Sequence, residues 1–293
     1  MQNSWRVLLF GVLLVAVVWG ALVAARVLST KIFKLQPTDQ PVIAVTIYPV
    51  YSLVKEVVGD DAELVLLVPP GASEHTFEPR PATIANLARA NLVFSVGQGL
   101  DNWVSQQAEQ VGQTKVITLD QGVDLIPNDP HYWLSPTEAA KMVDAITAAL
   151  IKEYPSKTVE WQNRSVLFKD RLEVFTKDYQ AKFKDKGSLE IATYHNAFSY
   201  LARDFNFTVA TTFEEIPGEE PTITWLANFQ QTIKDKSLKV VFAEPQSTRQ
   251  SLETIAQDAH VEVRLLDPIG GSAGRTTYLD LLKYNLDTIL SSQ

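Results

Sequence analysis

The feature that most constrains the fold of this chain is a long stretch in its middle that nothing interrupts. Residues 157–185 (KTVEWQNRSVLFKDRLEVFTKDYQAKFKD) contain neither Gly nor Pro, and their apolar residues recur at helical spacing. We therefore predict one helix of about 40 Å, at ~1.5 Å per residue. A single helix of that length is a stiff connector. We therefore expect only small rocking motions of the domains on either side of it, and no large hinge opening.

On both sides of this helix, strand-like runs alternate with helical patterns. The strand-like runs lie at 42–47, 63–68, 91–96 and 115–119 before it, and at 189–194, 207–212, 238–243 and 262–266 after it. The helical patterns lie at 49–58, 82–90, 101–112 and 135–154, and then at 197–205, 222–236, 248–259 and 277–291. Continuous apolar strands alternating with amphipathic helices indicate parallel sheets covered on both faces. The predicted fold class is α/β, with two (β/α)4 domains joined by one long rigid helix.

The length of 293 residues allows two domains of ordinary size, each with its own core. We place the N-terminal α/β domain at 41–156, the linking helix at 157–186 and the C-terminal α/β domain at 187–293. A polar spacer at 28–40 precedes them.

The first residues carry targeting information. Residues 7–25 (VLLFGVLLVAVVWGALVAA) are uncharged and mostly apolar, and Arg6 and Arg26 flank them. A helix over this run would span ~28 Å, close to the ~30 Å hydrocarbon core of a membrane, whereas a cleavable signal peptide has an apolar region of only ~7–15 residues. We therefore favour a signal anchor over 1–27, although Val23 and Ala25 offer a cleavage site. Both interpretations place the rest of the chain outside the cytoplasm, and the first makes the membrane a partner through the N-terminal helix.

Charge and cysteine content exclude several classes of function. The net charge is −8, with no clustered Lys and Arg of the kind that nucleic acids and anionic membranes attract, so we expect no nucleic-acid partner. The chain has no Cys, which excludes disulfides, thiolate metal ligands, thiol nucleophiles and attachment through a lipidated cysteine. We expect a monomer.

Three of the four histidines share a position relative to the predicted strands. His75, His131 and His195 lie where a strand-like run gives way to a loop, and Asp267 ends another such run. In open parallel α/β sheets, ligands bind beyond the carboxyl ends of the strands. Imidazole and carboxylate are ligands that zinc and related metals prefer. If the two sheets face each other, these side chains form a metal site in the interdomain cleft; His260, at a predicted helix end, suits an ordinary capping position.

Other polar residues could support such a site. A ligating histidine usually donates its second ring N–H to a carboxylate or carbonyl. Asp129, two positions before His131, and Glu78, three after His75, are candidates for that acceptor. Turn-forming and capping roles are the commoner ones for such residues.

At this point the motifs match a known family. GASEHTFEPRP, NDPHYWLSP, TYHNAFSYLARDF, VFAEPQ, LLDPIGG and TYLDLLKYNLDTI occur in this order. Together they closely resemble the zinc/manganese substrate-binding proteins of ABC transporters, from about Val42 to Leu290. The resemblance implies two α/β domains bridged by a rigid helix, with a metal ion buried between them.

Carried over by position, the family's ligands are His75, His131, His195 and the C-terminal carboxylate Asp267. Members thought to carry manganese tend to have Glu at the third position, so His195 favours Zn²⁺, with Mn²⁺ as the alternative. Glu244, in the FAEPQ segment, is interpreted as a residue that lines or orients the site.

Two departures from the family pattern bear on these expectations. The segment 120–131 (DQGVDLIPNDPH) is short and has no His-rich loop of the kind many zinc-specific members carry, which removes one support for zinc. Glu74 precedes His75, and in some zinc-binding relatives a glutamate at this point completes the coordination. We favour Asp267 over Glu74 as the fourth ligand.

The predicted function is the extracytoplasmic capture of Zn²⁺ for delivery to an ABC permease, by a binding protein and not an enzyme. A closed shell of three neutral imidazoles and one carboxylate suits binding, and affinity should fall as pH drops below ~6. Three alternatives stay open: Mn²⁺ uptake by the same mechanism, surface adhesion on this scaffold, and a zinc hydrolase with Glu244 or Glu74 as base.

Overall fold

Two parallel four-stranded sheets with the same strand order frame the structure. The computed structural model describes residues 40–112, 114–247 and 250–292. The first sheet has the order β2-β1-β3-β4, built from β1 (Val42–Val45), β2 (Glu63–Leu66), β3 (Leu92–Ser95) and β4 (Lys115–Thr118). The second has the order β6-β5-β7-β8, built from β5 (Leu189–Thr193), β6 (Phe207–Thr212), β7 (Val240–Ala243) and β8 (Glu262–Leu265). Every pairing is parallel, which confirms the predicted fold class of two parallel-sheet α/β domains.

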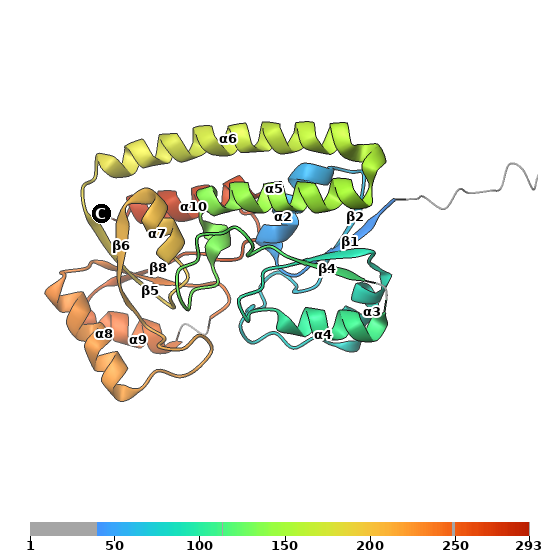
Figure 1. The fold of residues 1–293 in the computed structure, drawn as a ribbon. Coiled ribbons are helices and arrows are strands. Elements are labelled where there is room, and N and C mark those ends of the chain that lie inside the picture. Colours follow the sequence, from blue (N-terminus) through green and yellow to red (C-terminus); the bar gives the residue numbers. More distant parts are fainter. Residues whose placement is uncertain (1–39, 113, 248–249, 293) are drawn as a thin grey trace, which may run out of the picture. The chain divides into compact units, whose positions relative to one another are not determined.

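Helices cover both faces of each sheet (Figure 1). The first domain contains α2 (Tyr48–Val58), α3 (Pro81–Arg89), α4 (Asn102–Val111), the 3-10 turn η1 (Tyr132–Leu134) and α5 (Pro136–Glu153). After the 3-10 turn η2 (Pro155–Lys157) and α6 (Thr158–Lys184), the second contains α7 (Ser199–Phe205), α8 (Ile223–Asp235), α9 (Gln250–Ala259) and α10 (Tyr278–Leu290). In Figure 1, α3 and α4 lie below the first sheet and α8 and α9 below the second, while α2, α5 and α10 lie above.

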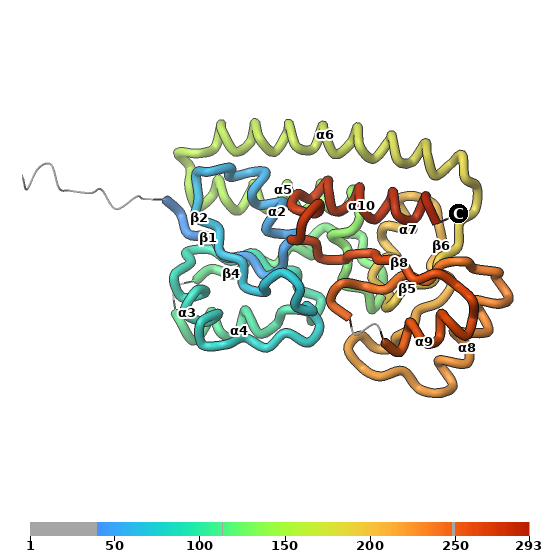
Figure 2. The backbone as a smooth tube through the Cα atoms, turned by 180° about the vertical axis from the view of Figure 1, so that it is seen from behind, coloured from blue at the N-terminus to red at the C-terminus, as the bar shows by residue number. Residues whose placement is uncertain are grey.

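The long helix α6 runs over both domains, as predicted, and Figure 2 shows the same span from behind. Its first half is tied to the first domain, because Arg164 contacts the backbone oxygen of Val58 at 2.5 Å and the carboxylate of Asp61 at 2.6 Å. Its second half is tied to the second domain, because the hydroxyl of Tyr179 donates to Asp287 at 2.7 Å. One element therefore holds two domains at fixed separation.

The two domains share one hydrophobic core beneath α6. Alternate residues of β1 point to opposite faces of the sheet, so Ile43 and Val45 enter this shared core whereas Ala44 packs against α3 and α4. The same shared core takes in Leu189 and Ile191 of β5 and the buried face of α6. A core that continues from one domain into the other resists their separation, since opening them would expose apolar surface.

Polar contacts also cross between the domains near η1. The indole N–H of Trp133 donates to the backbone oxygen of Pro268 at 2.8 Å, and the hydroxyl of Tyr278 donates to the backbone oxygen of Trp133 at 2.6 Å. Ser135 caps α5 by accepting from the N–H of Glu138, and the carboxylate of Glu138 contacts Arg203 of α7. The start of α5 is therefore fixed by the second domain.

The observed elements differ from the predicted ones mainly at their ends. Helix α7 begins at Ser199, two residues later than expected, because the chain first turns through a bond from the N–H of Ala197 to the backbone oxygen of His195. The predicted N-terminal membrane segment at 7–25 lies outside the described residues. Within the residues that are described, no helix is both long and apolar enough to span a membrane.

Candidate metal centre

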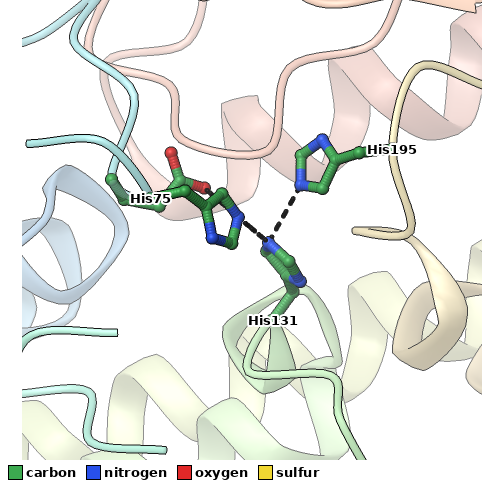
Figure 3. A group of neighbouring side chains, drawn as sticks. His75, His131 and His195 are labelled. Carbon is green, nitrogen blue, oxygen red and sulfur yellow. Dashed lines mark hydrogen bonds and ion pairs between the residues drawn. The ribbon is translucent and has the colours of Figure 1, made fainter. Parts of the chain in front are cut away.

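Three loops from two domains bring their side chains together in one place (Figure 3). Glu74 and His75 lie in the loop that follows β2, and His131 directly precedes η1. His195 comes two residues after the end of β5. Glu74, His131 and His195 are buried, while His75 is partly exposed. The loops that follow β2, β4 and β5 thus meet at one point, as the shared position of the three histidines predicts.

The ligand atoms of this group face one another. The Nε2 atom of His131 lies 3.0 Å from Nε2 of His75 and 3.1 Å from Nε2 of His195. One carboxylate oxygen of Glu74 lies 3.8 Å from Nε2 of both His75 and His131. All four ligand atoms fall within 4.8 Å of one another. Two ligand atoms on a tetrahedral zinc with Zn–N of ~2.0–2.1 Å are about 3.3 Å apart, so little adjustment would be needed to hold the ion.

Two carboxylates lie behind the histidine rings and orient them. Nδ1 of His131 lies 2.7 Å from Oδ1 of Asp129, and Nδ1 of His195 lies 2.8 Å from Oε1 of Glu244. In the neutral form of each ring, an Nδ1–H donated to the carboxylate leaves Nε2 with a free lone pair for a metal ion. Of the two acceptors considered from the sequence, Asp129 makes such a contact, whereas Glu78 is exposed.

Burial and charge shift the pKa values of the group in opposite directions. Burial, followed by the neighbouring His131 and His195, lowers the pKa of His75 to about 2, and burial also lowers the pKa of His131. Burial would lower the pKa of His195 too, but the carboxylate of Glu244 outweighs it and raises the value to about 9. Burial raises the pKa of Glu74 to about 7. Near neutral pH and without a bound metal, the imidazole of His195 is therefore protonated on both nitrogens and positively charged.

Glu74 completes the group, and Asp267 does not belong to it. One buried oxygen of Glu74 has no hydrogen-bond partner among the described residues, and the same holds for Oδ2 of Asp267; what separates the two is that only Glu74 places an oxygen within the group of ligand atoms. Asp267 is buried as well, but its carboxylate lies 2.7 Å from Nε of Arg275 and accepts the N–H groups of Ile269 and Gly270 at 3.0 and 2.9 Å. The group seen in the structure thus contains Glu74, the alternative fourth ligand, whereas Asp267 pairs with Arg275; which of the two carboxylates binds a metal stays a prediction.

Some residues that build the site gave no signal in the sequence. The hydroxyl of Tyr200, on α7, accepts the N–H of Ile126 at 2.7 Å and contacts the backbone oxygen of Asp129 at 3.1 Å, so it positions the loop that carries His131. Arg275 lies in the loop before α10, eight residues after Asp267. Both act through contacts between segments far apart in the chain, and no local spacing reveals such contacts.

A cavity beside the group connects it with the surface. It is lined by Glu74, His75 and His195 at the site and by Glu214, Glu219 and Glu220 of the loop after β6, among others. Carboxylates along an opening attract cations and repel anions. The approach to the group is therefore suited to a positively charged ligand.

Comparisons with known proteins agree with a metal centre. The family described as "Zinc-uptake complex component A periplasmic" (ZnuA) matches residues 43–292. The "High-affinity zinc uptake system protein ZnuA" of Bacillus subtilis is 27% identical over 280 residues, which cover 87% of this chain and 88% of that protein. The "Zinc-binding lipoprotein AdcA" of Streptococcus pneumoniae is 25% identical over 273 residues; the match covers 84% of this chain but only 54% of AdcA, so the chain spans about half the length of that relative.

Solved structures show the same likeness. The crystal structure of ZnuA has a TM-score of 0.80 at 26% identity, covering 87% of this chain and 99% of that one. The laminin binding protein (Lmb) of Streptococcus agalactiae, described as a bifunctional protein with adhesin and metal transporting activity, has a TM-score of 0.80 at 27% identity, covering 86% and 99%. Because the family match extends over nearly all the described residues, this chain belongs to the family of periplasmic zinc-uptake complex component A proteins.

Proposed function

We propose that this protein captures Zn²⁺ outside the cytoplasm and delivers it to an ABC permease in the membrane. The observation that carries the proposal is the convergence of three Nε2 atoms and one buried carboxylate oxygen within 4.8 Å. Three imidazoles and one carboxylate give zinc a closed tetrahedral shell, which leaves no position for a reacting water. Family membership supports the uptake role and the extracytoplasmic location.

The proposed ligands are His75, His131, His195 and Glu74. Three imidazole nitrogens and a single carboxylate favour zinc over Mn²⁺, which prefers oxygen ligands in larger number. Asp129 and Glu244 are proposed to hold the rings of His131 and His195, not to ligate. Because Glu244 contacts the Nδ1 edge of His195, it is poorly placed to act as general base on a water at Nε2, which weakens the hydrolase alternative.

The chain offers a matched pair of histidines for a direct test. We expect protein purified without added metal to contain about one zinc per chain by elemental analysis. In His195→Asn, calorimetry should show zinc affinity reduced by at least ~100-fold, because one of four ligands is lost. His260→Asn is the control, since His260 is exposed and follows α9 with a positive φ that Asn tolerates. Tight zinc binding that survives in His195→Asn would rule out the site as described.

Surface adhesion is the second candidate, and the likeness to Lmb is the observation that favours it. An adhesion role predicts saturable binding of immobilised laminin with the same affinity in wild type and His195→Asn. Absence of laminin binding in the presence of zinc would remove this candidate while leaving the uptake proposal intact.

A further inference from the structure

The buried carboxylate of Asp267 accepts hydrogen bonds at Oδ1 and forms an ion pair at Oδ2, where no hydrogen bond is made among the described residues. Its Oδ1 atom accepts from the side-chain amide of Gln246 at 3.0 Å and from the backbone N–H groups of Ile269 and Gly270. Its Oδ2 atom lies 2.7 Å from Nε of Arg275. A carboxylate held on both oxygens in this way must break an ion pair before it can bind a metal ion.

Asp267 is linked to the cavity beside the site through the side chain of Gln246. Gln246, which donates to Asp267, lines the cavity together with Glu74, His75 and His195. Asp267 and His195 both follow strands of the second sheet at the same edge. Besides Asp129 and Glu244, which contact the histidine rings, two further carboxylates therefore bear on the site: Glu74, which belongs to the group, and Asp267, which pairs with Arg275.

Arg275 is itself held firmly in the position that engages Asp267. Its guanidinium carbon lies 4.4 Å from the centre of the Tyr284 ring, and its Nη2 contacts the hydroxyl of Ser272. The same loop is tied to the first domain, because the hydroxyl of Tyr48 donates to the backbone oxygen of Thr276 at 3.0 Å. The arginine is thus fixed by its own domain and by the neighbouring one.

We propose that Arg275 is a specificity-determining residue, which withholds Asp267 from the metal and so keeps the shell at three histidines and Glu74. This inference rests on the proposed function. A second carboxylate in the shell would raise the coordination number and the share of oxygen ligands, which favours Mn²⁺ relative to Zn²⁺. By neutralising that carboxylate, Arg275 preserves a four-ligand site suited to zinc.

The test compares two metals in matched variants. Arg275→Met removes the charge and keeps the length of the side chain, and Arg264→Met is the control, since Arg264 pairs with Glu262 at the surface. Dissociation constants for Zn²⁺ and Mn²⁺ are measured by competition with a chelating dye. In Arg275→Met we expect affinity for Mn²⁺ relative to Zn²⁺ to rise by at least ~10-fold, the scale on which residues behind metal ligands act. Arg264→Met should match wild type.

The double variant Arg275→Met with Asp267→Asn tests whether the carboxylate of Asp267 causes the change in metal preference. It should return to the wild-type metal preference, because the released carboxylate is gone. The visible spectrum of the Co²⁺-loaded protein gives a second readout: bands of a tetrahedral ion in wild type and the double variant, and weaker bands of a higher-coordinate ion in Arg275→Met. A wild-type preference and spectrum in Arg275→Met, or a shift that persists in the double variant, overturns the inference.

If Arg275→Met does not fold, single substitutions of the two carboxylates still test whether Glu74 or Asp267 binds the metal. Asp267→Asn should leave zinc affinity within a few-fold of wild type and the Co²⁺ spectrum unchanged, whereas Glu74→Gln should alter both. Equal losses in the two variants would overturn the inference. Wild-type protein that binds neither metal would instead refute the proposed function, so the two failures are distinguishable.

Discussion

At the scale of single residues, the metal centre is built from atoms whose protonation must change when an ion enters. His195 carries a proton near neutral pH because the carboxylate of Glu244 raises its pKa to about 9. Glu74 has its pKa raised to about 7 by burial. A metal ion requires neutral imidazole and ionised carboxylate, so binding must displace these protons.

Zinc affinity should therefore rise with pH over a wide range. Below pH 7 both His195 and Glu74 are protonated in the free protein, and the logarithm of the affinity should rise by about two per pH unit. Between pH 7 and 9 only His195 still holds a proton, so the slope should be about one. The decline thus begins well above the pH of ~6 expected from ordinary histidines. Calorimetry in buffers of different ionisation enthalpy measures the protons released.

Glu244→Gln provides the control for this assignment. Removing the charge beside His195 lowers its pKa, so the slope between pH 7 and 9 should disappear while the slope below pH 7 becomes shallower. Wild-type affinity that stays constant from pH 7 to 9 would contradict the protonated His195.

The sequence revealed the histidines but not the arrangement of the carboxylates. The carboxylates are placed by contacts between residues far apart in the chain, which a local pattern does not show. His75, His131 and His195 were found because each follows a strand, a local relation that pattern analysis detects. Glu74 belongs to the group, whereas Asp267 pairs with Arg275, whose side chain is placed by the fold of a loop. Glu74 was recognised as an alternative, yet nothing in the chain's periodicity could rank the two.

At the scale of elements, α6 has one buried face and one apolar stripe that faces solvent. Trp161, Phe168 and Leu172 are buried against the shared core. Val159, Val166, Leu167 and Val174 are exposed on the same helix. The helical spacing of apolar residues predicted the helix correctly. It could not show which face is buried, because apolar residues line two opposite faces of the helix with the same periodicity.

Substitutions on the two faces should have very different effects on stability. Leu172→Ala leaves a cavity in the core and should lower the free energy of unfolding by about 2–5 kcal/mol. Val174→Ala removes a side chain that is 70% exposed and should change it by no more than ~0.5 kcal/mol. Urea denaturation followed by circular dichroism measures both. Similar losses in the two variants would show that the outer stripe is covered in solution.

At the scale of the whole molecule, the two domains are joined into one continuous structure. They share a hydrophobic core, a bridging helix and the contacts of Trp133 and Tyr278 across the interface. The strand alternation predicted two domains, and both sheets are present with the same order. What the sequence could not show is the continuity of the core, since that depends on how the faces of separate elements meet.

A shared core predicts one unfolding transition and not two. Tryptophan fluorescence and far-ultraviolet circular dichroism should give coincident curves in denaturant. Saturation with zinc at about 1,000 times its dissociation constant should add ~4 kcal/mol to the free energy of unfolding. His195→Asn should show the same single transition, but at the same zinc concentration its gain should be no more than ~1.4 kcal/mol, because a dissociation constant at least ~100-fold higher leaves zinc at no more than ~10 times that constant. Two separated transitions in wild type would mean that the domains unfold independently.

The division of the proposed ligands between the domains has a consequence for the lifetime of the bound ion. Glu74, His75 and His131 belong to the first domain, and only His195 comes from the second. Zinc held in this way can leave the second domain by breaking one bond while three others remain. An ion freed from His195 would still be held by the three ligands of the first domain, so its complete release requires those bonds to break as well. The first domain would therefore govern the residence time more than the second.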